Sequence, residues 1–540
     1  MSREERLRGL VESRPEGTRR PSGVTVLAAA IAITLIAPLG WLFVEVIDLG
    51  PRALSLTVAP RTIEVLLRSV ALVTVVTAAS VLVGVPIALL TARTDLPFAR
   101  SFTVLAALPL AIPSYLGALA ALSAFGEGGI LTRVLAPLGV PQVPEITGFA
   151  GAALVLTLYT YPYVLLTTRA SLLSLDTSLI EAARTLDAGR LEAFRRVTFP
   201  QIAPGIAAGA LLVALYTLAD FGTPNFMGVE VFTQAIYARY RNLMRPDAAL
   251  LSIQLLGVTA AILYLESQIG VDDERAYESQ GHRGGAVIEL GNWRYVAALL
   301  PATVATLAVA LPVIVFTLWL SSGETAGRLA FSWTYGWNSV YLALLAAGAS
   351  LLVAVPIAVA AARGRSRIAG LADRLSYVGY ATPGVVLAIA LLLFTLHGLP
   401  TSLTDAVYKT LPILVFAYVV RFVPQAIGAI RTATMQVDRR LIEAARTLGR
   451  TRTEAFRAVT LPLIAPGIAT GVALVFLTTM KELPATLLLR PFWFEHTLVT
   501  YIWRVREAGL YGRAAVPALV LIVISALSMA VILSQEGSNA

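Results

Sequence analysis

Two acidic residues occupy matching positions in a chain that repeats itself. An offset of 262 residues pairs Asp220 with Glu482. Each lies 20 residues after a proline, Pro200 in one case and Pro462 in the other. On a helix this separation spans about 30 Å, the thickness of a bilayer core. Carboxylate oxygens suit a hard cation, so the pair is a candidate contact for a cation at the outer mouth of a membrane pathway.

Three interpretations of this acidic pair stay open, namely substrate contact, docking of a partner protein, and plain interfacial charge. Lys481, directly before Glu482, counts against a cation site in the second half.

Arg421 and Tyr159 form a second pair of matched positions, inside apolar segments. An arginine within a membrane is costly and usually faces protein or a water-filled path. We expect a structural salt bridge or hydrogen bond for Arg421, with gating or substrate contact as the alternative. Both residues are therefore candidates for the pathway or its gate. The nearby Pro162 and Pro424 are also equivalent, and we predict that they kink their helices.

Other chemistries are excluded by residue type. The chain has no cysteine, and its three histidines lie far apart without ligand spacing, so no metal site is assigned. A phosphate-binding P-loop needs Gly-Lys-Ser/Thr, whereas the two lysines, Lys409 and Lys481, stand in other contexts. We find no clustered catalytic residues and expect no cofactor in this chain. We do not expect an enzyme, and any ATP that its function consumes is hydrolysed by another subunit.

The composition identifies a membrane as the surroundings of these residues. Of 540 residues, 57% are hydrophobic and 14% are charged, against about 45–50% and about 25% in soluble domains. The apolar residues form runs of roughly 20, enough to cross a bilayer as helices. We expect an all-α integral membrane protein with about twelve transmembrane helices, at 24–47, 65–91, 101–123, 148–168, 203–222, 247–265, 295–320, 338–362, 376–398, 409–430, 463–482 and 513–534.

Basic residues set the predicted orientation. The formal charge of +9 would suggest nucleic acid as a partner of a soluble protein, but here arginines gather in alternate segments between the spans. The positive-inside rule makes those segments cytoplasmic. Both termini are then cytoplasmic in a multi-pass protein of the cell membrane, whose partner is membrane lipid and not nucleic acid.

The internal repeat divides the chain into two halves. Leu179–Leu186 recurs as Leu441–Leu448, and the match continues beyond both segments. We predict a first repeat at 1–265, a cytoplasmic linker at 266–293 and a second repeat at 294–540. Six helices per half return the chain to the same side, so the repeats are parallel and related by a pseudo-two-fold axis along the membrane normal. A pathway on that axis is the natural expectation.

The recurring segments are amphipathic and lie in cytoplasmic loops at about 172–200 and 434–462. Each has a helical pattern of apolar residues followed by a turn. One interpretation is a helix that rests on lipid headgroups. Duplication favours another, two identical surfaces for two identical partners, since small alanine pairs let a partner backbone approach. The residues that carry these surfaces are Glu181, Ala182, Ala183, Asp187, Gly189, Glu443, Ala444, Ala445 and Gly449.

These segments resemble the EAA loop of permeases of binding-protein-dependent ABC importers, in which Glu-Ala-Ala precedes a glycine and a later x-Leu-Pro. The second copy starts at Glu443 and has Gly449, whereas the first has Asp187 at the glycine position and Gly189 two residues later. The resemblance implies that both loops dock on two ATP-binding cassette subunits, which use ATP and Mg. It also implies an extracytoplasmic solute-binding protein as a partner and a type I importer fold.

Several stretches look like the ferric-iron branch of that family. They include Leu108–Tyr115, Leu218–Gly222 and Met480–Leu487, and fusion of two halves in one chain also occurs there. The resemblance implies a permease for ferric iron. A thiamine or other small-solute permease is the alternative within the class, and a secondary transporter driven by an ion gradient is the alternative outside it. A secondary transporter has no use for two ATPase-docking surfaces.

Overall fold

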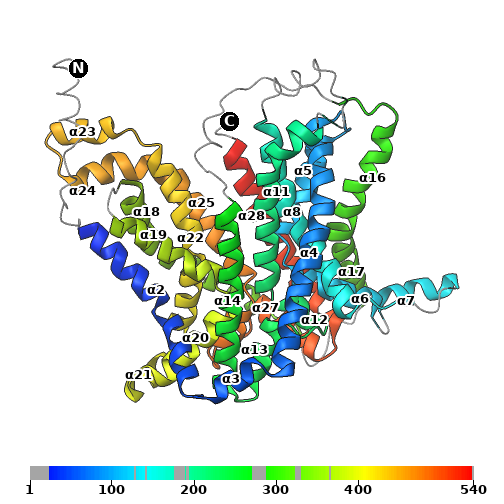
Figure 1. The fold of residues 1–540 in the computed structure, drawn as a ribbon, viewed down its shortest axis with the longest axis horizontal. Helices are drawn as coiled ribbons and strands as arrows, with labels where there is room; N and C mark the ends of the chain where they lie inside the picture. The colour runs from blue at the N-terminus through cyan, green and yellow to red at the C-terminus, as the bar shows by residue number, and fades with distance from the viewer. Residues whose placement is uncertain are drawn as a thin grey trace.

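The computed structural model describes residues 23–537 apart from 127–128, 140–142, 176–188, 190–191, 193, 270–287, 323–329 and 364–366. All named elements in this part of the chain are helical (Figure 1). The long helices are α2 (Gly23–Ile47), α4 (Pro60–Arg93), α8 (Gly148–Leu173), α11 (Phe199–Ala219), α14 (Arg245–Ile269), α18 (Trp333–Arg363), α22 (Leu411–Met435), α25 (Leu461–Met480) and α28 (Ala515–Gly537). The short helices α3 (Arg52–Thr57), α13 (Phe232–Arg241) and α21 (Thr401–Val407) gather at the lower end in Figure 1.

The predicted all-α membrane fold is confirmed. Among the described residues ten helices are long and apolar enough to cross a membrane, or eleven if one bent pair counts as a span. The seventh predicted span corresponds to α16 (Trp293–Ala305), η4 (Thr306–Ala310) and α17 (Leu311–Ser321), which together form one candidate span. The last predicted span falls on α28, where the described apolar stretch, Tyr511–Leu527, is shorter than the others.

Two predicted spans, 101–123 and 376–398, are wrong as continuous helices. In the first half, α5 (Ala99–Ala107) and η1 (Leu108–Leu110) end before α6 (Ser114–Phe125) begins. In the second half, α19 (Arg367–Ala381) and α20 (Gly384–His397) meet at 104°.

The cause of both breaks is a matched proline. Pro113 and Pro383, 270 residues apart, precede α6 and α20 with ψ of 133° and 138°. Proline lacks the N–H that would continue the preceding helix, and it disfavours helical geometry in the residue before it. The two breaks place Ser114 at the start of α6 and Gly384 at the start of α20.

The first helix of each half packs against helices of the other half. Helix α2 packs against α18, α19 and α20 of the second half, while α16 packs against α4 and α5 of the first. Figure 1 shows the same exchange, with α2 at the left beside α18 to α20 and α16 at the right beside α5. The interface between the halves is therefore held from both sides.

Close helix pairs in the two halves rest on equivalent glycines. A Cβ atom on Gly209 of α11 would lie 2.6 Å from the Cα of Val164 in α8. A Cβ atom on Gly471 of α25 would lie 3.0 Å from the Cα of Ala426 in α22. Small residues at such positions let membrane helices approach closely, so α8–α11 and α22–α25 form matched rigid pairs.

The end of the predicted linker is attached to the first half. Ile288 donates from its backbone N–H to the carbonyl of Arg93, 2.8 Å away, and Asp95 accepts from the N–H of Leu290 at 2.8 Å. Residues 270–287 of the linker lie outside the described residues. The boundaries 1–265, 266–293 and 294–540 stay predictions.

Candidate functional site

Asp220 follows the last residue of α11 and caps the short helix α12 (Gly222–Phe226). Its carboxylate accepts a hydrogen bond from the backbone N–H of Thr223 at 2.8 Å and another from the hydroxyl of Ser114 at the start of α6. The hydroxyl of Tyr216 donates to Ser114 at 3.2 Å. The first half thus holds its acid with neutral donors.

Glu482 occupies the same place in the second half. It lies between α25 and α26 (Pro484–Leu489), is 5% exposed, and accepts from the backbone N–H of Ala485 at 3.0 Å. Its other partner is the guanidinium of Arg421, with 3.3 Å between Nη1 and Oε1. Both acids therefore cap a short helix three residues on, and the predicted equivalence of Asp220 and Glu482 extends to their backbone geometry.

The two halves differ by an exchange of three side chains. Ser114, Gly117 and Tyr159 of the first half correspond to Gly384, Leu387 and Arg421 of the second. A Cβ atom on Gly384 would lie 1.6 Å from Nη1 of Arg421, and a Cβ atom on Gly117 would lie 2.1 Å from Cε2 of Tyr159.

Gly384 therefore leaves room for the side chain of Arg421, and Gly117 leaves room for the side chain of Tyr159. Arg421 extends toward the start of α20 and reaches the acid, whereas Tyr159 packs along α6. The hydroxyl of Tyr159 donates to the carbonyl of Ala308 at 2.9 Å. Ala308 lies in the π-helical segment η4, where the regular helical hydrogen bonds are interrupted.

Residues of both halves meet around the two acids. The ammonium of Lys481 donates to the carbonyl of Leu110 at 3.0 Å. The hydroxyl of Tyr115, the residue after Ser114, donates to the carbonyl of Lys481 at 3.4 Å, and Arg421 pairs with Glu482. The structure therefore brings together Asp220, Glu482 and Arg421, three residues that the sequence analysis proposed for the pathway, and it separates the hydroxyl of Tyr159 from them.

The sequence analysis missed Ser114 as a partner of Asp220 and missed the role of Gly384. The available signal was the 270-residue offset that pairs these two positions directly after Pro113 and Pro383. Ser114 and Gly384 stand at equivalent sites directly after these prolines. This difference indicates that a side chain fills this space in the first half, and that the second half leaves the space open.

The end of the bundle near these acids is closed by a contact between equivalent helices, α13 and α27 (Leu498–Glu507). Arg241 pairs with Glu507 at 3.2 Å, and Tyr237 packs edge to face on Trp503 with ring centroids 5.7 Å apart. Phe221 stacks on the same indole at 5.1 Å. These rings and the ion pair form a closure near the cluster of Asp220, Glu482 and Arg421, named the outer closure after the orientation that the sequence predicts.

The opposite end of the bundle carries the second recurring segment (Figure 1). Helix α23 (Arg439–Thr447) starts at Asp438, whose carboxylate accepts from the N–H of Arg440 at 2.9 Å. Glu443 and Ala444 are exposed, and Ala445 is 8% exposed. Gly449 follows with φ of 85°, the left-handed geometry predicted for the helix end.

This segment forms a concave surface rather than a flat one. A hollow of about 480 Å³ lies on it and is lined by Glu443, Arg446, Thr447, Gly449, Arg450 and Thr451. A short helix, α24 (Arg452–Ala455), and a π-helical turn, η5 (Phe456–Thr460), connect the hollow to α25. The same π-helical turn precedes α11 in the first half, as η3 (Phe194–Thr198).

The matching residues of the first segment, Glu181, Ala182, Ala183 and Asp187, lie outside the described residues, and Gly189 is exposed. The roles of all nine residues of the two segments as partner contacts stay predictions.

The model for the family described as "Binding-protein-dependent transport system inner membrane component" matches residues 80–266 and 354–535. The chain belongs to this family. The two matched ranges confirm that the chain contains two copies of one permease unit, as the repeat predicted. They also confirm the resemblance to permeases of binding-protein-dependent importers.

Relatives of this permease include fused and single-unit proteins. It is 29% identical over 522 residues, 94% of this chain and 97% of the relative, to the "Fe(3+)-transport system permease protein FbpB 2" of Haemophilus influenzae. It is 32% identical over 232 residues, 41% of this chain and 86% of the relative, to the "Molybdenum transport system permease protein ModB" of Mycobacterium tuberculosis. The "Ferric transport system permease protein FbpB" of Actinobacillus pleuropneumoniae is 24% identical over 84% of this chain and 68% of its own length.

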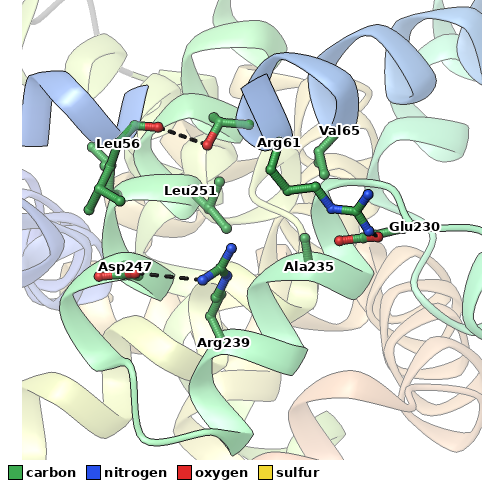
Figure 2. Close-up of a pocket in the computed structure, with 10 residues that line it drawn as sticks. Leu56, Arg61, Val65, Glu230, Ala235, Arg239, Asp247 and Leu251 are labelled. Atoms are coloured by element: carbon green, nitrogen blue, oxygen red, sulfur yellow. Dashed lines mark hydrogen bonds and ion pairs between the residues drawn. The ribbon is translucent and has the colours of Figure 1, made fainter. Parts of the chain in front are cut away.

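A small pocket of this permease is lined by charged side chains that form ion pairs with each other. Figure 2 shows Arg61 directed at Glu230, and Arg239 directed at Asp247, with 3.8 Å between the charged atoms of the second pair. The cavity measures about 30 Å³, room for about one water molecule. One pair joins α4 to the segment before α13, and the other joins α13 to α14, so these charges brace the outer closure from the first half.

No group of three or more acidic, histidine or cysteine side chains converges on a metal position among the described residues.

Proposed function

We propose that this permease is the membrane subunit of an ATP-driven importer of ferric iron. The observation that carries the proposal is one bundle with an exposed docking segment at one end and a paired-acid cluster at the other. The name of the Haemophilus relative, which matches nearly the whole chain, supports ferric iron as the substrate. Ferric ion is hard and favours oxygen ligands, which Asp220 and Glu482 supply.

Energy enters through two ATP-binding cassette subunits that bind the recurring segments. The exposed Glu443 and Ala444 and the hollow ending at Gly449 form the contact in the second half, and Glu181–Asp187 forms it in the first. These segments then face the cytoplasm, together with both termini. Movement of the docked subunits is transmitted through η3 and η5 to α11 and α25, whose far ends carry Asp220 and Glu482.

Substrate enters at the opposite end. An extracytoplasmic binding protein delivers the ion to the outer closure formed by α13 and α27. Opening of this closure exposes the paired acids, which lie directly behind Phe221 and Trp503. The same movement that opens the outer end closes the bundle toward the cytoplasm, so access alternates between the two sides of the membrane.

Import of an oxyanion is the second candidate. It is supported by the half-buried cation of Arg421, 19% exposed in its side chain, by Lys481 directly before Glu482, and by the name of the molybdenum relative. The acids oppose this candidate, because Glu482 occupies the guanidinium of Arg421, and Lys481 donates to the carbonyl of Leu110.

Reconstituted uptake tests the proposal. The permease is assembled in proteoliposomes with its ATPase subunits and binding protein, ATP is enclosed, and radioactive ferric iron, molybdate, sulfate and thiamine are offered in turn. We expect ATP-dependent uptake of ferric iron alone. Uptake of molybdate or sulfate without ferric iron would replace the proposal with the oxyanion candidate.

A further inference from the structure

A guanidinium in the second half of this permease replaces a hydroxyl of the first. Ser114 donates to Asp220, whereas Arg421 pairs with Glu482 at 3.3 Å. Arg421 also acts electrostatically on Asp220. Arg421 is therefore the direct counter-ion of Glu482, and its charge also reaches Asp220.

The backbone is built to admit this guanidinium. A Cβ atom placed on Gly384 would lie 1.6 Å from Nη1 of Arg421, so any other residue there would displace the guanidinium from its present position. In the first half the glycine stands at Gly117 instead, and Tyr159 fills that space. The exchange of glycine between the two positions shows that the second half has a dedicated place for a cation beside its acid.

We propose that Arg421 is the resident counter-ion of the acid pair and that the translocated cation displaces it. The inference rests on the proposed import of a cation. Unpaired carboxylates out of water are costly, so Arg421 stabilises the empty pathway. A site in a pathway must also be weak enough to release its ion. The guanidinium of Arg421 competes with the ion for the carboxylates and so lowers the affinity of the site for the ion. Arg421 therefore sets both the preference for cations and the release of the ion.

The first half supplies the variant that tests this role without leaving a buried group unpaired. The triple change Gly384→Ser, Leu387→Gly and Arg421→Tyr copies the arrangement of Ser114, Gly117 and Tyr159 into the second half. Glu482 then gains a hydroxyl donor in exchange for the guanidinium. The single change Arg421→Gln serves as a second route to the same loss of charge. Both are made in the full complex with the ATPase subunits.

Terbium(III) is a suitable probe, because it is a hard trivalent cation that takes oxygen ligands, and its emission is sensitised by nearby tyrosines such as Tyr115 and Tyr216. We expect the triple variant and Arg421→Gln to bind terbium at least about tenfold more tightly than the native complex, since a positive charge has left the site. Adding Asp220→Asn and Glu482→Gln to the triple variant should cancel the gain. Ferric uptake should fall in the triple variant, because the ion is retained.

Arg431→Gln is the matched control, because Arg431 lies on the same helix and forms its own ion pair with Asp373 at 2.7 Å. Terbium binding should not change in this variant. Unchanged terbium binding in both Arg421 variants would overturn the proposal, and so would loss of molybdate binding in them, which would make Arg421 an anion ligand. Failure of the native complex to import ferric iron would instead refute the proposed substrate, a result that the uptake panel reports separately.

Discussion

Arg241 and Glu507 occupy equivalent positions in the two halves and form an ion pair with each other at 3.2 Å. The local offset is 266 residues, and the turns that follow agree, with φ of 61° at Leu243 and 69° at Gly509. Equivalent residues can touch only near the axis that relates their halves. The pair therefore marks the pseudo-two-fold axis at the end of the bundle that carries α13 and α27, where the predicted pathway on that axis would open.

Cross-linking across this axis should stop transport. The chain has no cysteine, so Arg241→Cys with Glu507→Cys gives a single pair of thiols for a reducible bifunctional reagent. We expect cross-linking to lower ferric uptake by at least about tenfold, because α13 and α27 can no longer separate, and reduction to restore it. Uptake before and after reductant checks this.

The control pair lies on the same face but within one half. Arg61→Cys with Glu230→Cys joins α4 to the segment before α13, across the ion pair seen in Figure 2. Cross-linking there should leave most of the uptake intact. Equal inhibition by both cross-links would show that the outer closure does not open along the axis.

Changes on α23 should uncouple the permease from ATP without unfolding it. Glu443 is exposed, and Gly449 has φ of 85°, a geometry that disfavours side chains. We expect Glu443→Arg or Gly449→Trp to abolish co-purification of the ATPase and ATP-driven uptake, while the amount of protein in the membrane stays normal. Normal transport with either change would contradict the docking role.

The first segment should be more tolerant at the corresponding turn. Asp187 occupies the glycine position there, so Asp187→Gly brings the first copy closer to the second. We expect ATPase binding and uptake within about twofold of the native levels, because the variant carries the residue that the second copy has at this position. Loss of ATPase binding would show that the two segments dock differently.

The acid pair should act on transport and not on ATPase binding. Asp220→Asn together with Glu482→Gln keeps size and hydrogen bonding but removes the negative charge that attracts a hard cation. We expect reduced ferric uptake with unchanged ATPase co-purification. Normal uptake at saturating binding protein, with weaker docking of that protein, would favour a docking role for the acids, and no change in either would leave them as interfacial charges.

The helix pairs α8–α11 and α22–α25 should depend on their glycines. A Cβ atom at Gly209 would lie 2.4 Å from Oγ1 of Thr167 as well as 2.6 Å from the Cα of Val164. We expect Gly209→Val or Gly471→Val to destabilise the fold by about 1–3 kcal/mol, the usual cost of overpacking, and to lower the Tm in detergent. Gly257→Val is the control, because a Cβ atom there meets nothing within 4 Å. Equal losses in all three would point to helix propensity instead of packing.

Periodicity and repetition predicted most of the fold, because long apolar runs leave helices as the one structure that satisfies the backbone in lipid. They did not predict the breaks at Pro113 and Pro383. Proline is also found inside the intact helices α8 and α22, at Pro162 and Pro424, so proline alone does not separate a broken span from a continuous one.

The candidate site was predicted in part. Asp220, Glu482 and Arg421 could be selected from matched positions alone, but the pairing of Arg421 with Glu482 depends on how α20 turns back after Gly384. The outer closure was missed because its residues follow a 266-residue offset, and insertions between the halves shift the offset from 270 to 262 and then to 266. Contacts across a pseudo-axis become visible only when both halves are placed together.

Composition of the assembled complex tests the central claim most directly, namely that one chain provides both membrane halves of an ATP-driven importer. Native mass spectrometry of the complex purified with its ATPase should show one permease chain with two ATPase subunits, and the same preparation should import ferric iron only when ATP is enclosed. Two permease chains per pair of ATPase subunits, or uptake that proceeds without ATP, would contradict the account.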